Sequence, residues 1–313
     1  MSLRAWLIVF TALWTPIATW GAPPARDGFV PVPGGPVWYR VVGEGDAVPL
    51  VVLHGGPGGT SCGYSLLEPL AEERPLVRYD QLGTGRSGRP DDPLLWTVER
   101  YVEELHILRQ TLGLDRIHLL GHSWGGSLAA SYVLAKGTDG IVSLTLSSPL
   151  LSTADWIEDA NALRRQLPED IQATLARHEA AGTTGHPDYE AAADVFYSRH
   201  VWGGQRQDPP SACSGAPGNQ FIYEHMWGPT EFYATGNLVD YDVTGRLGEL
   251  DLPVLLIAGE FDEATPERMA EFQALIPGAR LEIIADAAHA TISRQTANYL
   301  RVLRTFLDDA ETR

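Results

Sequence analysis

The stretch that most constrains this chain is RIHLLGHSWGGSLAASYVLA, residues 116–135. Its first part is an apolar run typical of a buried strand, and its second part repeats apolar residues at helical spacing. Ser123 stands at the junction, inside the glycine-framed sequence GHSWG. A strand that turns into a helix within so few residues strains the backbone at the turn and requires small neighbours. The pattern is the G-x-S-x-G elbow, which predicts that the Ser123 hydroxyl projects beyond the strand end as a nucleophile.

Short apolar runs alternate with helical patterns along the rest of the chain, which is long enough to bury one large core. Such alternation favours an α/β fold, a mainly parallel sheet flanked by helices on both faces. Residues 151–237 break the rhythm and are expected to form an inserted, mostly helical cap, which leaves the core at 23–150 and 238–313. The predicted strands lie at 48–54, 75–80, 116–123, 141–149, 252–259 and 279–285, and helical patterns lie at 97–112, 125–135, 266–276 and 296–307.

The N-terminal residues resemble a secretory leader. Arg4 precedes an apolar run at 5–14, and small residues follow up to Ala22. This order predicts a signal peptide at 1–22 and an exported enzyme, periplasmic or secreted. The apolar run is short for a transmembrane helix, so the mature form is expected to have no membrane span. An uncleaved anchor is the alternative.

The chain contains two cysteines, Cys62 and Cys213. In an oxidising compartment they could form a disulfide. The alternative is that each is a small buried residue without a partner.

Charge and motif spacing argue against several classes of function. The net charge is −17 and no Lys/Arg cluster occurs, which argues against a nucleic-acid partner. The glycine-rich stretch at 80–88 lacks the Lys-Ser/Thr of a phosphate-binding loop, so a structural turn is expected there. His118 and His122 are four apart but lie on a predicted strand and elbow, so no metal site is expected.

A serine nucleophile needs a base to take its proton and an acid to orient that base. With a nucleophile elbow, these residues follow in the order serine, acid, histidine. Of the nine histidines, His289 alone lies beyond the last plausible acid-bearing strand, and it is the predicted base. The loop before it offers Glu260, Asp262 and Glu263 as acids. Asp262 is favoured because a turn starting at Gly259 would lift it above the strand end.

Catalysis by acyl transfer also needs backbone N–H groups aimed at the developing oxyanion. One is expected from Trp124, directly after the nucleophile. The other is expected from the loop HGGPGG, residues 54–59, because its glycines let the backbone approach a substrate closely.

Taken together, these motifs resemble those of the proline iminopeptidases, a family of serine peptidases. The similarity covers most of the chain after about residue 28. G-x-S-x-G alone marks a superfamily, whereas H-G-G-P-G together with G-P-x-E-F is much more specific. The matching segments are HGGPGG (54–59), DQLGTGRS (80–87), GHSWGG (121–126), MWGPTEF (226–232) and GEFDEATPE (259–267).

The resemblance implies an α/β-hydrolase core, no cofactor, and release of an N-terminal residue, often proline, from short peptides through an acyl-enzyme. Carried onto this sequence, it gives Ser123 as nucleophile, Asp262 as acid and His289 as base. The oxyanion amides would be those of Gly56 and Trp124.

The resemblance also implies that glutamates of the cap hold the free ammonium group of the peptide or aminoacyl substrate. Glu231 falls in the GPTEF motif, and Glu190 is the candidate for a second glutamate. Thr84 stands where relatives often carry cysteine. Amino-acid amidases and esterases share the pattern and remain an alternative, as does a non-catalytic binding protein with this fold.

Overall fold

The computed structural model describes residues 23–312. The leader predicted at 1–22 therefore lies outside the described residues. Within the described part of the chain, none of the helices combines the length and the apolar character needed to span a membrane.

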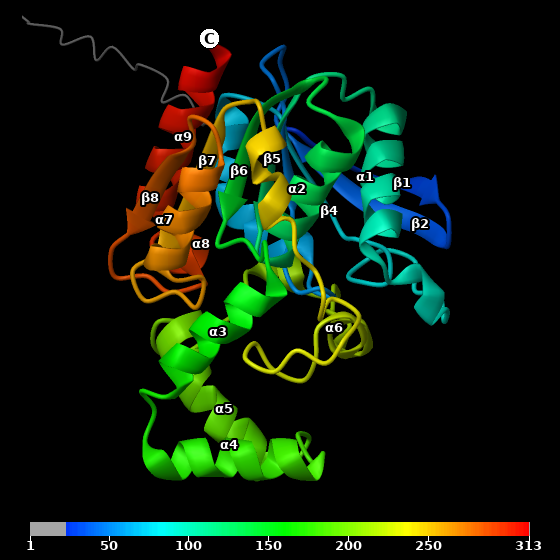
Figure 1. The fold of residues 1–313 in the computed structure, drawn as a ribbon. Coiled ribbons are helices and arrows are strands. Elements are labelled where there is room, and N and C mark those ends of the chain that lie inside the picture. Colours follow the sequence, from blue (N-terminus) through cyan, green and yellow to red (C-terminus); the bar gives the residue numbers. More distant parts are fainter. Residues whose placement is uncertain (1–22, 313) are drawn as a thin grey trace, which may run out of the picture.

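An eight-stranded sheet forms the centre of the molecule (Figure 1). Its order is β1-β2-β4-β3-β5-β6-β7-β8. β2 pairs antiparallel with β1 and with β4, and every pairing from β4 to β8 is parallel. The strands are β1 (Ala25–Val32), β2 (Gly35–Val42), β3 (Leu50–Leu53), β4 (Leu76–Tyr79), β5 (Ile117–His122), β6 (Ile141–Ser147), β7 (Val254–Gly259) and β8 (Arg280–Ile284).

The predicted strands correspond to β3 through β8, and the mainly parallel α/β fold is confirmed. The hairpin of β1 and β2 was not predicted. Its prolines, among them Pro31 and Pro36, interrupt the alternation that marks a strand, and such residues are tolerated in strands mainly at sheet edges. β1 is an edge strand, and five of its eight residues are exposed, so its sequence lacks the continuous apolar run of the central strands.

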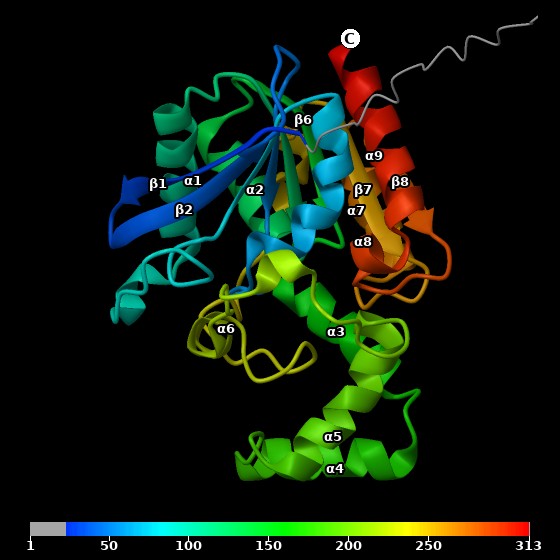
Figure 2. The same ribbon diagram turned by 180° about the vertical axis from the view of Figure 1, so that it is seen from behind.

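Helices cover both faces of the sheet and bury two apolar cores against it. Central strands such as β3 and β7 are buried along their whole length, as expected for a parallel sheet covered on both sides. One face carries α1 (Val98–Leu112), α2 (Trp124–Lys136) and α7 (Pro266–Leu275), as Figure 1 shows. The other carries the 3₁₀ segment η1 (Ser61–Glu72), α8 (Thr291–Arg294) and α9 (Thr296–Glu311), as Figure 2 shows.

A helical region follows β6 and precedes β7, at the carboxyl ends of the parallel strands (Figure 1). The hairpin of α4 and α5 lies farthest from the sheet. No strand occurs between β6 and β7, a stretch that the structure describes completely. The region contains α3 (Thr153–Arg164), α4 (Glu169–Ala181), α5 (Pro187–Phe196), a π-helical turn η3 (Tyr197–Val201), α6 (Gln220–Met226), and the 3₁₀ turns η4 (Ser211–Cys213) and η5 (Thr244–Glu249); another such turn, η2 (Pro93–Leu95), precedes α1.

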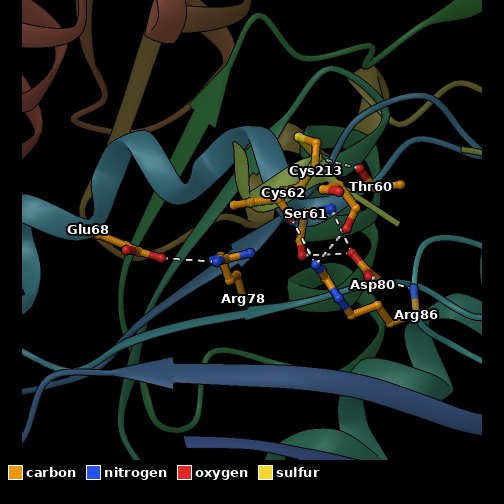
Figure 3. Close-up of a disulfide and its surroundings, with 10 residues drawn as sticks. Thr60, Ser61, Cys62, Glu68, Arg78, Asp80, Arg86 and Cys213 are labelled. Atoms are coloured by element: carbon orange, nitrogen blue, oxygen red, sulfur yellow. Dashed lines mark hydrogen bonds and ion pairs between the residues drawn. A yellow bond between two sulfur atoms is a disulfide. The ribbon is translucent and has the colours of Figure 1, made fainter. Parts of the chain in front are cut away.

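Cys62 and Cys213 form a disulfide, so the two cysteines are paired in the structure (Figure 3). The bond joins the start of η1, on the core, to η4, in the helical region. It therefore links two segments that lie 151 residues apart in the sequence.

Candidate active site

Ser123 occupies the sharp turn between β5 and α2. Its φ of 56° lies in the left-handed region, which side chains other than glycine rarely adopt. The flanking glycines allow β5 and α2 to meet at this angle. A Cβ on Gly121 would lie 2.0 Å from the carbonyl oxygen of Gly125, and one on Gly125 would lie 2.2 Å from that of Leu53. Both positions therefore require glycine, and the strained turn presents Ser123 at the carboxyl edge of the sheet.

Asp262 and His289 come together from the loops that follow β7 and β8. His289 Nδ1 lies 2.8 Å from Asp262 Oδ1. Three further groups donate to the same carboxylate: the Ser148 hydroxyl at 2.6 Å, and the backbone amides of Gly259 at 3.1 Å and Ala264 at 2.9 Å. The carboxylate is thus fixed in orientation by hydrogen bonds from several elements.

The charges of Asp262 and His289 support each other in a buried setting. Burial acts to raise the pKa of Asp262, but the charge and hydrogen bond of His289 outweigh it, and the pKa falls below its ordinary value. For His289, burial acts to lower the pKa, but the charge and hydrogen bond of Asp262 raise it above its ordinary value. A proton taken up by this imidazole is consequently stabilised.

Packing brings the elbow and the imidazole side by side. The ring of His122, directly before Ser123, lies 4.7 Å from the ring of His289 between centroids. Trp156 of α3 packs edge-on against His289 at 5.6 Å. Among the described residues, Ser123 Oγ has no hydrogen-bond partner. Such bonds are often long in the free enzyme and tighten when substrate binds.

Gln81 ties the loop at 54–59 to the residue after the nucleophile. Its amide donates to His54 Nε2 and its side chain donates to the His54 carbonyl, both at 3.0 Å. Its side-chain oxygen accepts from Trp124 Nε1 at 2.9 Å. Within the described chain, the amides of Gly56 and Trp124 donate no hydrogen bond to protein. They are the two N–H groups predicted to bind an oxyanion.

A cavity of about 1250 Å³ opens between the helical region and the core. Glu231 lines it, together with Gly56 from the core and Tyr223 from α6. The backbone of Glu231 is held by Trp156, whose Nε1 donates to the Glu231 carbonyl at 2.9 Å. Burial raises the pKa of the Glu231 carboxyl, and the charge of His289 and the Tyr223 hydroxyl lower it in part. The charge of His289 therefore acts on the Glu231 carboxyl.

Glu263 is a second carboxyl group at this site, considered from the sequence only as an alternative to Asp262. It is fully buried, and neither carboxylate oxygen has a hydrogen-bond partner among the described residues. Burial, then the charges of Glu231 and Asp262, raise its pKa well above the ordinary value. The nearest group that can carry a positive charge is His289, whose Nδ1 lies 3.9 Å from Glu263 Oε1. A buried carboxyl without a hydrogen bond requires a proton or a cation. The sequence signal that could have identified Glu263 is its place in FDEATP, directly after Asp262, the acid predicted to orient the base.

Glu190 lies on α5 and lines the same cavity. Unlike Glu231 and Glu263, its side chain is exposed. An exposed carboxylate keeps its hydration, so its interaction with a substrate ammonium is weaker than that of a buried one.

Among the residues that the structure describes, one group of potential metal ligands lies at the α4–α5 hairpin: His178, His186 and Asp188. The guanidinium of Arg177 already lies among them, 3.2 Å from His178 Nε2 and 3.9 Å from Asp188 Oδ2. Its positive charge offsets the negative charge of Asp188. The hairpin also lies far from the elbow at the start of α2 (Figure 1), so these three residues are not part of the candidate active site.

Comparison with known proteins places the chain in a family. Residues 48–293 match the alpha/beta hydrolase fold family. A proline iminopeptidase of Heyndrickxia coagulans is 43% identical over 288 residues, which cover 90% of this chain and 98% of that protein. The chain belongs to the proline iminopeptidase family of α/β hydrolases. The resemblance inferred from the motifs is thereby confirmed.

Solved structures agree with this assignment. The proline iminopeptidase of Mycobacterium smegmatis matches with a TM-score of 0.81 and 36% identity, over 92% of this chain and 99% of that one. VinJ matches with a TM-score of 0.85 and 32% identity, over 92% of this chain and all of that one. The fold therefore extends over the helical region as well as the core.

Proposed function

We propose that this chain is a serine aminopeptidase that releases N-terminal proline from short peptides. The observation that carries the proposal is a pair of carboxyl groups, Glu231 and Glu263, beside the Asp262–His289 pair. Its relatives named proline iminopeptidase support the same substrate class.

The proposed reaction runs through an acyl-enzyme. Ser123 Oγ attacks the scissile carbonyl and passes its proton to His289, while Asp262 orients the imidazole and stabilises its charged form. The amides of Gly56 and Trp124 donate to the oxyanion of the tetrahedral intermediate. His289 then returns the proton to the leaving amine, and water hydrolyses the acyl-enzyme by the same steps in reverse.

The two glutamates would restrict the enzyme to free amino termini. A substrate ammonium placed between Glu231 and Glu263 gains charge-assisted hydrogen bonds from both. Without it, the two carboxyl groups repel each other, and burial favours their neutral forms. A blocked N-terminus leaves these groups unpaired, so it is expected to be rejected.

A substrate panel tests the proposal. Prolyl, alanyl and other aminoacyl arylamides would be compared with N-acetylprolyl arylamide and a simple acetyl ester. We expect the free prolyl arylamide to have the highest kcat/KM and the N-blocked form to be hydrolysed at least about tenfold more slowly. Equal cleavage of blocked and free substrates would refute the aminopeptidase assignment. Preference for aminoacyl esters over every arylamide would favour the amidase or esterase alternative.

We also propose that residues 1–22 are removed and that the mature enzyme is exported, to the periplasm or the medium. The order of charged, apolar and small residues in this segment supports the proposal. The Cys62–Cys213 disulfide supports it independently, because such bonds persist mainly in oxidising compartments. N-terminal sequencing of the active protein from its native host is the test, and recovery of Met1 or Ser2 would contradict export with cleavage.

A further inference from the structure

The Cys62–Cys213 disulfide joins the start of η1 to η4, and Figure 3 shows the bond and its surroundings. Cys62 follows the oxyanion loop at 54–59, and its Sγ lies 3.0 Å from Thr60 Oγ1. Cys213 belongs to the segment 203–218, which leads into α6. The bond thus connects the residues that follow the predicted oxyanion loop with the segment that precedes α6, the helix that carries Tyr223.

The segment 203–218 has little apolar packing of its own. Most of its residues are exposed, and Ala216 is its one buried residue. Besides the disulfide, hydrogen bonds attach it to core loops: the Arg86 side chain donates to the Ala212 carbonyl, and the Gly85 amide donates to the Pro217 carbonyl, both at 2.9 Å. A segment with so few buried contacts has low local stability when a covalent link is removed.

Asn219 transmits the position of this segment to the site. Its amide donates to the Gly58 carbonyl at 2.7 Å, and its side chain accepts from the first amides of α6. α6 in turn carries Tyr223, which lines the same cavity as Glu231. Arg206 and Gly218 of the segment line this cavity as well. The oxyanion loop is also held by Gln81, and Asn219 is also held by the core, since its Nδ2 donates to the Gly83 carbonyl at 2.9 Å.

We propose that the Cys62–Cys213 disulfide is a positioning bond for the substrate amine site, and that its reduction weakens binding of free-amine substrates while leaving acyl transfer intact. The proposal rests on the aminopeptidase function proposed above. The half-buried Cys213 is the more accessible sulfur for a dithiol reductant. The reductant thiolate attacks Cys213 Sγ and releases Cys62 as a thiolate. The second thiol of the reductant then displaces Cys213, so two electrons pass to the protein and the reductant becomes a disulfide.

The test measures prolyl arylamide and acetyl ester hydrolysis by the full-length mature enzyme before and after reduction with dithiothreitol. If reduction leaves about one molecule in ten with α6 in place, KM for the arylamide rises about tenfold. We expect kcat for the arylamide and kcat/KM for the ester to change by less than about twofold, because the groups that perform chemistry are untouched. Reoxidation should restore the original KM.

The double variant Cys62→Ala/Cys213→Ala is the matched control, because the chain has no other cysteine. It should show the raised KM in either redox condition and should not respond to dithiothreitol. An unchanged KM after complete reduction would overturn the proposal. A parallel loss of arylamide and ester turnover would overturn it as well, because the bond would then serve general stability. Failure of the oxidised enzyme to hydrolyse any free-amine substrate would instead refute the proposed function.

Discussion

The core side of this active site and its cap side, the helical region between β6 and β7, are held in place by different means. On the core side, Ser123 follows directly after β5, and Asp262 and His289 lie in the loops after β7 and the edge strand β8, where backbone geometry or hydrogen bonds fix each of them. On the cap side, Trp156 of α3 donates to the Glu231 carbonyl, and the segment that precedes α6 is tied to the core by a disulfide. The residues proposed to perform the reaction thus lie on rigid elements, whereas Glu231 lies in a region with weaker attachment to the core.

This difference predicts that chemistry and selection can be separated by mutation. Ser123, Asp262 and His289 should affect every substrate, whereas Glu231, together with Glu263 on the core side, should affect only those with a free amine.

Ser123→Ala should have the largest effect. Removing the nucleophile is expected to lower kcat by about 10⁵- to 10⁶-fold for prolyl arylamide and acetyl ester alike. A fluorophosphonate probe should label the parent enzyme and not the variant, while both retain the same thermal unfolding midpoint. Residual ester hydrolysis near the parent rate would show that another group performs the chemistry.

Glu231→Gln should affect one substrate class. Charge-assisted pairing with an ammonium contributes about 1.5–3 kcal/mol, so kcat/KM for prolyl arylamide should fall about 10- to 150-fold. Acetyl ester hydrolysis should barely change. Glu263→Gln should act in the same direction. Equal losses on both substrates would mean that Glu231 supports the core and does not select the amine.

The pairing of Asp262 with His289 on the core side agrees with their predicted roles, and those catalytic roles stay predictions. The cap side was less well defined by the sequence. An elbow such as that at Ser123 is a local steric pattern, and chain order then restricts the base to His289. Glu263 was missed as a site residue because its burial beside Glu231 depends on contacts between core and cap. Glu190 was chosen from the family resemblance, which does not reveal which carboxyl loses its hydration. The hairpin of β1 and β2 was missed because its prolines interrupt the alternation of apolar and polar residues that marks a strand.

The pH dependence should also differ between the two substrates. His289 must be neutral to act as base, and its pKa is raised above 6.5 by Asp262 against the effect of burial. Ester kcat/KM should therefore decline as pH falls through a value above 6.5. Arylamide hydrolysis also needs an ionised Glu231, whose pKa is raised by burial, so its acidic limb should be steeper. In Glu231→Gln that extra steepness should disappear, and its persistence would assign it to another group.

The smallest effect is expected for Glu190→Gln. Glu190 lines the cavity from α5 with an exposed side chain, and exposed ion pairs contribute about 0–1 kcal/mol because water screens them. Its removal should lower kcat/KM for prolyl arylamide by less than about fivefold, and added salt should remove even that difference. The matched comparison is Glu231→Gln, which makes the same chemical change at a half-buried carboxyl. A loss at Glu190 as large as at Glu231 would assign substrate selection to α5 as well. Burial would then no longer distinguish the carboxyl groups that bind the amine from those that only line the cavity.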